Sequence, residues 1–142
     1  MIVYVELEQI LLNNIYFSDT IKNTVIENGK FIRLIYSSNN VILNGIYINI
    51  PFIINKSSCN KYYFNFHDNN NYKKKLMDIE ELILSKYDTK KNKIYKITEQ
   101  LNLNTIKLFN YIDNHNKIIL KISGLWEDEK NYGLTYKFIC YN

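Results

Sequence analysis

Two runs of alternating side chains near the end of the chain restrict the fold more than any other feature. The runs are "KIILKIS", residues 117–123, and "GLTYKFICY", residues 133–141, and a short charged segment separates them. Alternation of apolar and polar residues is typical of a half-buried β-strand. The sequence therefore predicts a β-hairpin over residues 118–140.

The same alternation predicts the register of this hairpin. If Lys121 lies opposite Lys137, the apolar residues of both strands share one side and the lysines share the other with a Ser123–Thr135 pair. A slip of one residue would mix the two sets, so this register is favoured. The residues expected on the core side are Ile118, Leu120, Ile122, Tyr136, Phe138 and Cys140, with Ile119 and Ile139 as apolar exceptions on the other side.

Composition also favours a sheet. The chain has 142 residues, which suit one domain spanning 1–142. It has no Ala, the best helix former, and it is rich in Ile, Tyr and Phe, which fit a pleated surface. Arg33 is the only Arg among many Lys, a bias typical of an A/T-rich genome. Part of the net charge of +4 and of the 13 Tyr follows from that bias.

Shorter patterns predict the order of the remaining elements. Asn28-Gly29 between apolar runs predicts a hairpin of residues 21–27 with 31–37. Strands are expected at 2–7, at 41–50 as one central strand, and at 61–66, while 10–17 fits a helix or a buried strand. Helices are expected at about 76–87 and 94–103, with a strand from 105 as the alternative end of the second.

This order predicts an α+β domain with one or two helices and a C-terminal β-hairpin. Two architectures fit it. One is a mainly antiparallel β-sheet with helices on one face, and the other is an open barrel like the oligonucleotide-binding (OB) fold.

No motif of a common enzyme class occurs in the sequence: GxGxxG, P-loop, HExxH and GxSxG patterns are absent. Cys59, Cys140, His67 and His115 lack the spacing of a zinc site or of a nucleophile pair. Glu80 and Glu81 are expected on the exposed side of their helix, and residues 127–129 in a solvated acidic tip. We therefore expect a non-enzymatic protein with no catalytic residue, no metal and no cofactor.

Basic and aromatic residues suggest a recognition surface for single-stranded nucleic acid, which is held by cations on its phosphates and by aromatic rings on its bases. The candidate stacking residues are Trp126 and Tyr132 at the hairpin tip, and Tyr47, Tyr62 and Tyr63 on other strands. The candidate phosphate contacts are Arg33, Lys61, Lys73, Lys74, Lys75, Lys121, Lys130 and Lys137. The competing interpretation is that Trp126 caps the core and that Lys73 to Lys75 form a solvated loop.

The segment "ILKISGLWEDEKNYGLTYKF", residues 119–138, resembles the C-terminal hairpin of small proteins of nucleocytoplasmic large DNA viruses. In those proteins an "ISG-[aliphatic]-W-E" run precedes "YGLTYKF". The resemblance implies a viral protein of the host cytoplasm or viral factory, or of the virion. It also implies a relation to viral single-stranded-DNA-binding proteins with an OB fold.

Two functions follow as expectations. The first is binding of single-stranded DNA or RNA through a basic and aromatic sheet face. The alternative is a structural or interaction protein, a virion component or assembly factor, that uses the same aromatic surface as a protein interface. A homo-oligomer is compatible with either. No membrane is expected, because no 18-residue apolar run occurs, and two distant cysteines suggest a reducing compartment.

Overall fold

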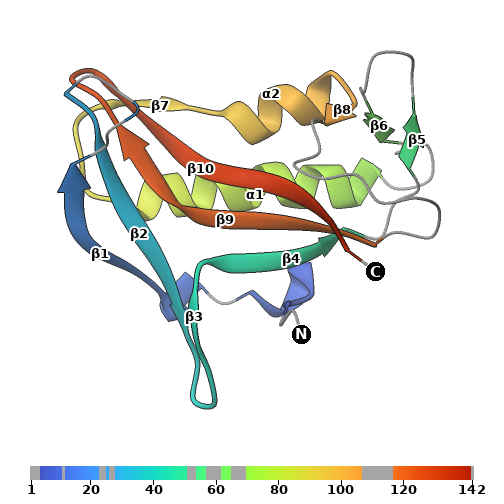
Figure 1. The fold of residues 1–142 in the computed structure, drawn as a ribbon, viewed down its shortest axis with the longest axis horizontal. Helices are drawn as coiled ribbons and strands as arrows, with labels where there is room; N and C mark the ends of the chain where they lie inside the picture. Colours follow the sequence, from blue (N-terminus) through green and yellow to red (C-terminus); the bar gives the residue numbers. More distant parts are fainter. Residues whose placement is uncertain are drawn as a thin grey trace.

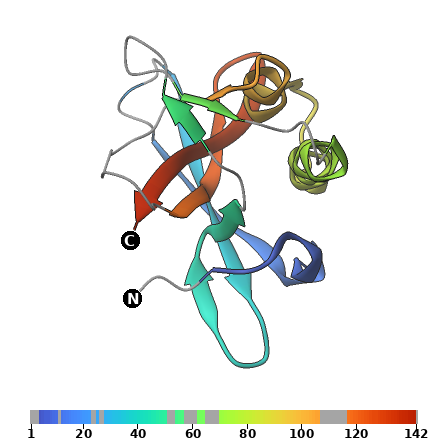
Figure 2. The ribbon, with the colours of Figure 1, turned by 90° about the vertical axis from the view of Figure 1, so that its right-hand side faces the viewer.

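A mixed, mostly antiparallel sheet of seven strands dominates the molecule, and two helices lie on one of its faces (Figures 1 and 2). The computed structural model describes residues 4–10, 12–22, 25, 28–50, 54–56, 62–64, 70–106 and 117–141. The strand order β1-β2-β9-β10-β7 has two open ends, so the sheet is not closed into a barrel. The predicted α+β class, with a mainly antiparallel sheet, is confirmed.

The elements follow one another in a simple order. Two 3-10 turns, η1 (Leu7–Gln9) and η2 (Leu12–Asn14), precede β1 (Ile15–Lys22), β2 (Lys30–Ser37), β3 (Ile42–Asn44), β4 (Ile46–Ile50), β5 (Ile54–Lys56) and β6 (Tyr62–Phe64). Then come α1 (Asn70–Lys86), β7 (Asn92–Ile94), α2 (Lys96–Asn102), β8 (Thr105–Ile106), β9 (Lys117–Glu127) and β10 (Asn131–Tyr141). In the main sheet, β3 also pairs with β2, and β4 also pairs with β9. β7 and β10 are parallel, whereas the other named strands of this sheet pair antiparallel. β5, β6 and β8 form a separate small sheet.

The hairpin of β9 and β10 has the predicted register over most of its length. Lys121 lies opposite Lys137, and Phe138 lies opposite Leu120. The predicted Ser123–Thr135 pair is wrong, because Thr135 lies opposite Gly124 and Ser123 is the extra residue of a β-bulge. A bulge inserts one residue, so every side chain of β9 beyond it changes face.

This bulge decides where Trp126 and Glu127 point. Continued from Ile118, Leu120 and Ile122, plain alternation would place residue 126 in the core. Because of the extra residue, Leu125 and Glu127 face the helices and are buried, while Trp126 lies on the opposite face of the sheet. The expected solvated tip therefore does not include Glu127, which is only 5% exposed.

Two glycines mark the place where β4 replaces β2 along one edge of β9. Residues 30–33 of β2 pair with the second half of β9, and β4 pairs with the first half. Gly45 connects β3 to β4 with a φ of +101°, a conformation that suits glycine. A Cβ on Gly124 would lie 2.1 Å from the Ile32 carbonyl oxygen, so only glycine fits this close approach of β2 and β9.

The break at Gly45 corrects the prediction of one central strand over 41–50. Ile46, Ile48 and Ile50 of β4 are buried, as the apolar pattern suggests. Ile42 shares their sequence parity but lies before the break, and its side chain is 74% exposed.

The helices pack on the core face of the sheet through apolar and hydrogen-bonded contacts. Ile97 and Leu101 of α2 are buried, as predicted. The Tyr132 hydroxyl donates to the Leu84 carbonyl of α1 at 2.8 Å, and the Tyr136 hydroxyl donates to Gln100 of α2 at 2.6 Å. Helix α1 begins at Asn70, so residues 73–75, expected in a loop, are helical.

Glu80 is fully buried, which corrects its expected exposure. Its carboxylate accepts hydrogen bonds from the backbone N–H groups of Ile97 and Thr98, each at 2.8 Å, and from the Thr98 hydroxyl at 2.7 Å. The first N–H groups of a helix have no partner within that helix. A side chain of α1 thus caps the start of α2, at which Tyr95 provides no side-chain cap.

The N-terminal third differs from the predicted strand limits. Val5 makes only an isolated bridge with Ile48, and Leu7 begins a 3-10 turn, so no strand spans the described part of 2–7. The strand that pairs with β2 is 15–22, and it begins before the predicted strand because Ile15 and Phe17 pack into and against the core. Ile21 and Lys22 of the predicted 21–27 pair with β2, and residues 23, 24, 26 and 27 lie outside the described residues. Asn28 has the predicted turn conformation, with a φ of +54°. Cys140 is buried, whereas Cys59, Lys61, His67 and His115 lie outside the described residues.

Candidate nucleic-acid interface

The sheet face opposite the helices, here called the outer sheet face, gathers cations and aromatic rings. Its members follow from the strand registers and from the residues already assigned to the core face. Cations and rings on it come from four strands that are distant in sequence. The residues of this face are Phe31, Arg33, Tyr47, Asn49, Ile119, Lys121, Gly124, Trp126, Gly133, Thr135, Lys137 and Ile139.

Trp126 lies in a cross-strand row between Phe31 of β2 and Gly133 of β10. A Cβ on Gly133 would lie 2.9 Å from the indole Nε1 and 3.0 Å from Cε2, so the pyrrole side of the indole rests against this glycine. Both Trp126 and Phe31 are half-buried. The two rings are therefore held by the sheet while part of each remains accessible.

A second row places two lysines beside a tyrosine. Tyr47, Lys121 and Lys137 lie opposite one another on β4, β9 and β10. The Lys121 Nζ is 5.4 Å from the centroid of the Tyr47 ring, which is a cation–π distance. This contact fixes the ammonium group over the strand without neutralising its charge.

Arg33 lies between these rows, opposite Gly124, and is exposed. No carboxylate of a described residue forms an ion pair with its guanidinium. The described outer-face positions of β2, β4, β9 and β10 include no Asp or Glu. Among the described positions of the outer sheet face, the charged side chains are therefore all cations.

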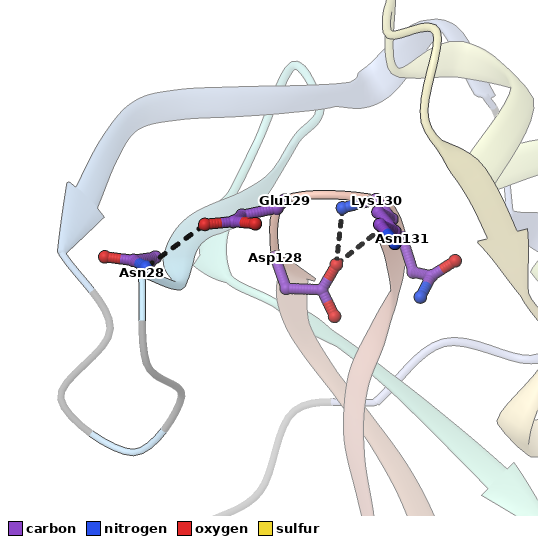
Figure 3. A pocket seen from close by; sticks show the side chains of 5 residues that line it. All are labelled: Asn28, Asp128, Glu129, Lys130 and Asn131. Carbon is purple, nitrogen blue, oxygen red and sulfur yellow. Dashed lines mark hydrogen bonds between the residues drawn. The ribbon is translucent and has the colours of Figure 1, made fainter.

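The hairpin tip next to Trp126 is acidic and internally bonded, as Figure 3 shows. Asp128 accepts hydrogen bonds from the backbone N–H groups of Asn131 and Lys130, which lower the pKa of its carboxyl group. Glu129 accepts a hydrogen bond from the Asn28 side chain at 3.2 Å, which joins this tip to the turn before β2. The turn at the hairpin tip is thus held by its own hydrogen bonds and is linked to the turn at Asn28.

The structure does not bring all predicted contact residues to the outer sheet face. Tyr132 is 2% exposed and points toward α1, so its ring is not available to a base. Lys73, Lys74 and Lys75 lie on α1, on the other side of the sheet, where Lys73 donates to the Asn104 side chain. Lys130 is exposed at the acidic tip. Tyr62 and Tyr63 lie in β6, and their side chains are outside the described part of the chain.

One member of the surface was missed from sequence. Phe31 shares its strand parity with Arg33 in "KFIRL", so the alternation that places Arg33 on the outer face also places Phe31 there. Tyr47 was only a secondary candidate, and its role beside Lys121 depends on the pairing of β4 with β9, which has no local sequence cue.

A second polar cluster joins α1 to β7 outside the outer sheet face. Glu81 accepts hydrogen bonds from Tyr95, from Lys93 at 2.9 Å and from Ser85 at 2.9 Å, and these bonds lower its pKa to about 2. Its carboxylate in turn raises the pKa of Lys93, so this amine is not a general base for Ser85, 2.7 Å away. The cluster connects the helix to the sheet edge.

Comparisons of the chain with family models, with curated proteins and with solved structures found no match. Within the described residues, no three His, Cys, Asp or Glu side chains converge on a common metal position. None of the described helices has the length and apolar character needed to cross a bilayer.

Proposed function

We propose that this chain is a non-enzymatic protein that binds single-stranded DNA or RNA through its outer sheet face. The observation that carries the proposal is the alignment of Arg33, Lys121 and Lys137 with the rings of Trp126, Phe31 and Tyr47 on one face whose described positions include no Asp or Glu.

The chemistry of the two rows suits different parts of a nucleotide. Bases stack on aromatic side chains irrespective of sequence, and each stack contributes about 1–3 kcal/mol. Trp126 and Phe31 supply this platform, and the contact with Gly133 limits the entropy lost when a base stacks. The cations supply phosphate contacts, so binding is expected to weaken as salt rises.

Charge favours a path along β9 from Trp126 toward Lys121. Asp128 and Glu129 would repel phosphates at the tip, whereas the other direction leads across Arg33 to the lysine row. Trp126 lies five positions beyond Lys121 along β9, a length of roughly 16 Å. The proposed site therefore spans a few nucleotides, and short oligonucleotides suffice to test it.

The sole Trp of the chain provides the readout. A base that stacks on Trp126 should quench its fluorescence, and titration with an oligothymidylate at two salt concentrations measures both affinity and salt dependence. With about three phosphate contacts, the slope of log K against log salt should be about −2. Arg33→Ala and Lys121→Ala should each weaken binding and reduce that slope by about 0.7.

Lys74→Ala is the matched control, because it removes the same charge from α1 on the opposite side of the sheet. It should leave both affinity and slope close to those of the unmodified chain. Equal losses for Lys74→Ala and Arg33→Ala would mean that only net charge matters. Absence of quenching and of binding at low salt would overturn the proposal and favour the protein-interface alternative.

A further inference from the structure

The end of the β2–β3 hairpin projects from the body of the sheet (Figure 1). Beyond Arg33, β2 no longer pairs with β9 and instead pairs with β3, with Tyr36 opposite Leu43 and Ser37 opposite Ile42. Within the described part of the chain, no strand pairs with the other edge of β3. This hairpin therefore presents an open strand edge.

The backbone groups at this edge can be assigned from the turn. The Ser38 N–H donates to the Val41 carbonyl at 2.9 Å, so residues 38 and 41 form a hydrogen-bonded pair. Because such pairs alternate in an antiparallel ladder, the N–H and C=O groups of Ile42 and Asn44 point away from β2. The Ile42 side chain is 74% exposed, the highest value for a large apolar residue in a strand whose side chains the structure describes.

The hairpin also lacks charge, in a chain that carries a net charge of +4. Residues 34–55 contain no Asp, Glu, Lys, Arg or His. Two copies of a positively charged chain repel each other where like charges meet, and this neutral segment is a place where they can approach. Because this segment has no cation to contact phosphates, a nucleic acid is not a suitable partner for the edge of β3.

A comparison with β1, the strand at one end of the main sheet, shows what β3 lacks. Natural edge strands are commonly protected from pairing by charges, Pro residues or bulges. β1 has a register break between Phe17 and Thr20, and it carries Asp19 and Lys22. β3 has the sequence Ile-Leu-Asn and an unbroken register with β2, so it lacks charge, Pro and bulge, and only its length of three residues limits pairing.

We propose that β3 pairs antiparallel with β3 of a second copy of this chain. With Ile42 of one copy opposite Asn44 of the other, the outward N–H and C=O groups form about four intermolecular hydrogen bonds. Such an interface is isologous, with a two-fold axis perpendicular to the sheet. A strand this short covers less surface than a permanent dimer needs, so the dimer dissociates on dilution.

The two-fold axis has a consequence that rests on the proposed function. It joins the two main sheets edge to edge and places both outer sheet faces on the same side. A strand of nucleic acid long enough to reach both sites would then bind more tightly than a short one, because the second contact is intramolecular.

Sedimentation velocity over a range of protein concentrations, without nucleic acid, tests the dimer. The mass should rise above the monomer value of 17.0 kDa as concentration increases. Ile42→Lys should weaken association at least tenfold, because it puts a like charge at the pairing edge. Ile21→Lys on β1 is the matched control, since Ile21 is also exposed, at 49%, and it should leave association unchanged.

A monomeric mass at every concentration, or equal association of the Ile42→Lys and Ile21→Lys variants, would overturn the proposal. Thermal unfolding of both variants establishes that they are folded. Quenching of Trp126 by a short oligonucleotide does not require the dimer, so failure of the dimer and failure of the proposed function are separate results.

Discussion

On the helix-covered face of the main sheet, the buried polar groups of β9 and β10 have protein partners, whereas Arg33 and Lys121 of the outer sheet face form no ion pair with a carboxylate of the described residues. Glu127 accepts from the Tyr87 hydroxyl and lies 3.5 Å from the Lys91 ammonium, and the Tyr132 hydroxyl donates to α1. On the other face, Arg33 is exposed and Lys121 is half-buried. Polar groups under the helices thus serve stability, and the outer sheet face is the proposed ligand surface.

Adjacent residues of β10 offer the strongest test of this difference. Phe138 faces the helices and is 1% exposed, while Ile139 faces the other way and is half-buried. Phe138→Ala should lower the free energy of unfolding by about 3–5 kcal/mol, because it leaves a cavity in the core. Ile139→Ala should lower it by only about 1 kcal/mol. Urea titration followed by circular dichroism measures both values.

Similar losses for the two variants would contradict the assignment of a core face and an outer face to β10. The slope of unfolding free energy against urea serves as the control, since it should stay constant if both variants unfold from the same compact state.

Two neighbouring glutamates of α1 provide a second, smaller contrast. Glu80→Ala leaves the N–H groups of Ile97 and Thr98 without their acceptor in a buried position, so we expect a loss of about 2 kcal/mol. Glu81→Ala removes a carboxylate that is 47% exposed, and the expected loss is below about 1 kcal/mol. Thermal unfolding of both variants shows which one loses more stability. A larger loss for Glu81→Ala would show that the cap of α2 contributes little.

These glutamates also illustrate what the sequence could predict. Position 80 lies on the apolar stripe with Leu76, Ile83 and Leu84, so helical spacing assigns it to the core. Its charge nevertheless led to an expectation of exposure, because the compensating N–H groups belong to a helix that begins 16 residues later. Local periodicity could have identified the face of Glu80, but the prediction of exposure was wrong, and only the tertiary contact explains why a glutamate lies there.

The hairpin and the candidate site follow the same rule. Alternation within residues 118–122 and 136–140 was sufficient for the register, and parity continued from Phe138 would also have assigned Tyr132 to the core. The bulge at Ser123 could not be read from that pattern, because it accompanies the close approach of β2 at Gly124, a contact between distant segments. That single inserted residue exchanges Trp126 and Glu127 between the two faces, and so determines which ring the outer sheet face presents.

The polar cluster of Glu81, at the edge of the helix-covered side, gives the smallest expected effect, which is a change of stability with pH. Hydrogen bonds from Tyr95, Lys93 and Ser85 lower the pKa of Glu81 from 4.5 to about 2 in the folded protein. A depressed pKa means that the stabilising contribution is complete above about pH 4.5 and is lost as pH falls toward 2. The difference in stability between the unmodified chain and Glu81→Gln should therefore be small but measurable at pH 6, and should shrink by pH 2.5. If the difference in stability is the same at both pH values, the charge of the Glu81 carboxylate does not contribute to stability through these partners. This polar cluster would then be like the outer sheet face, whose charges are not expected to stabilise the fold.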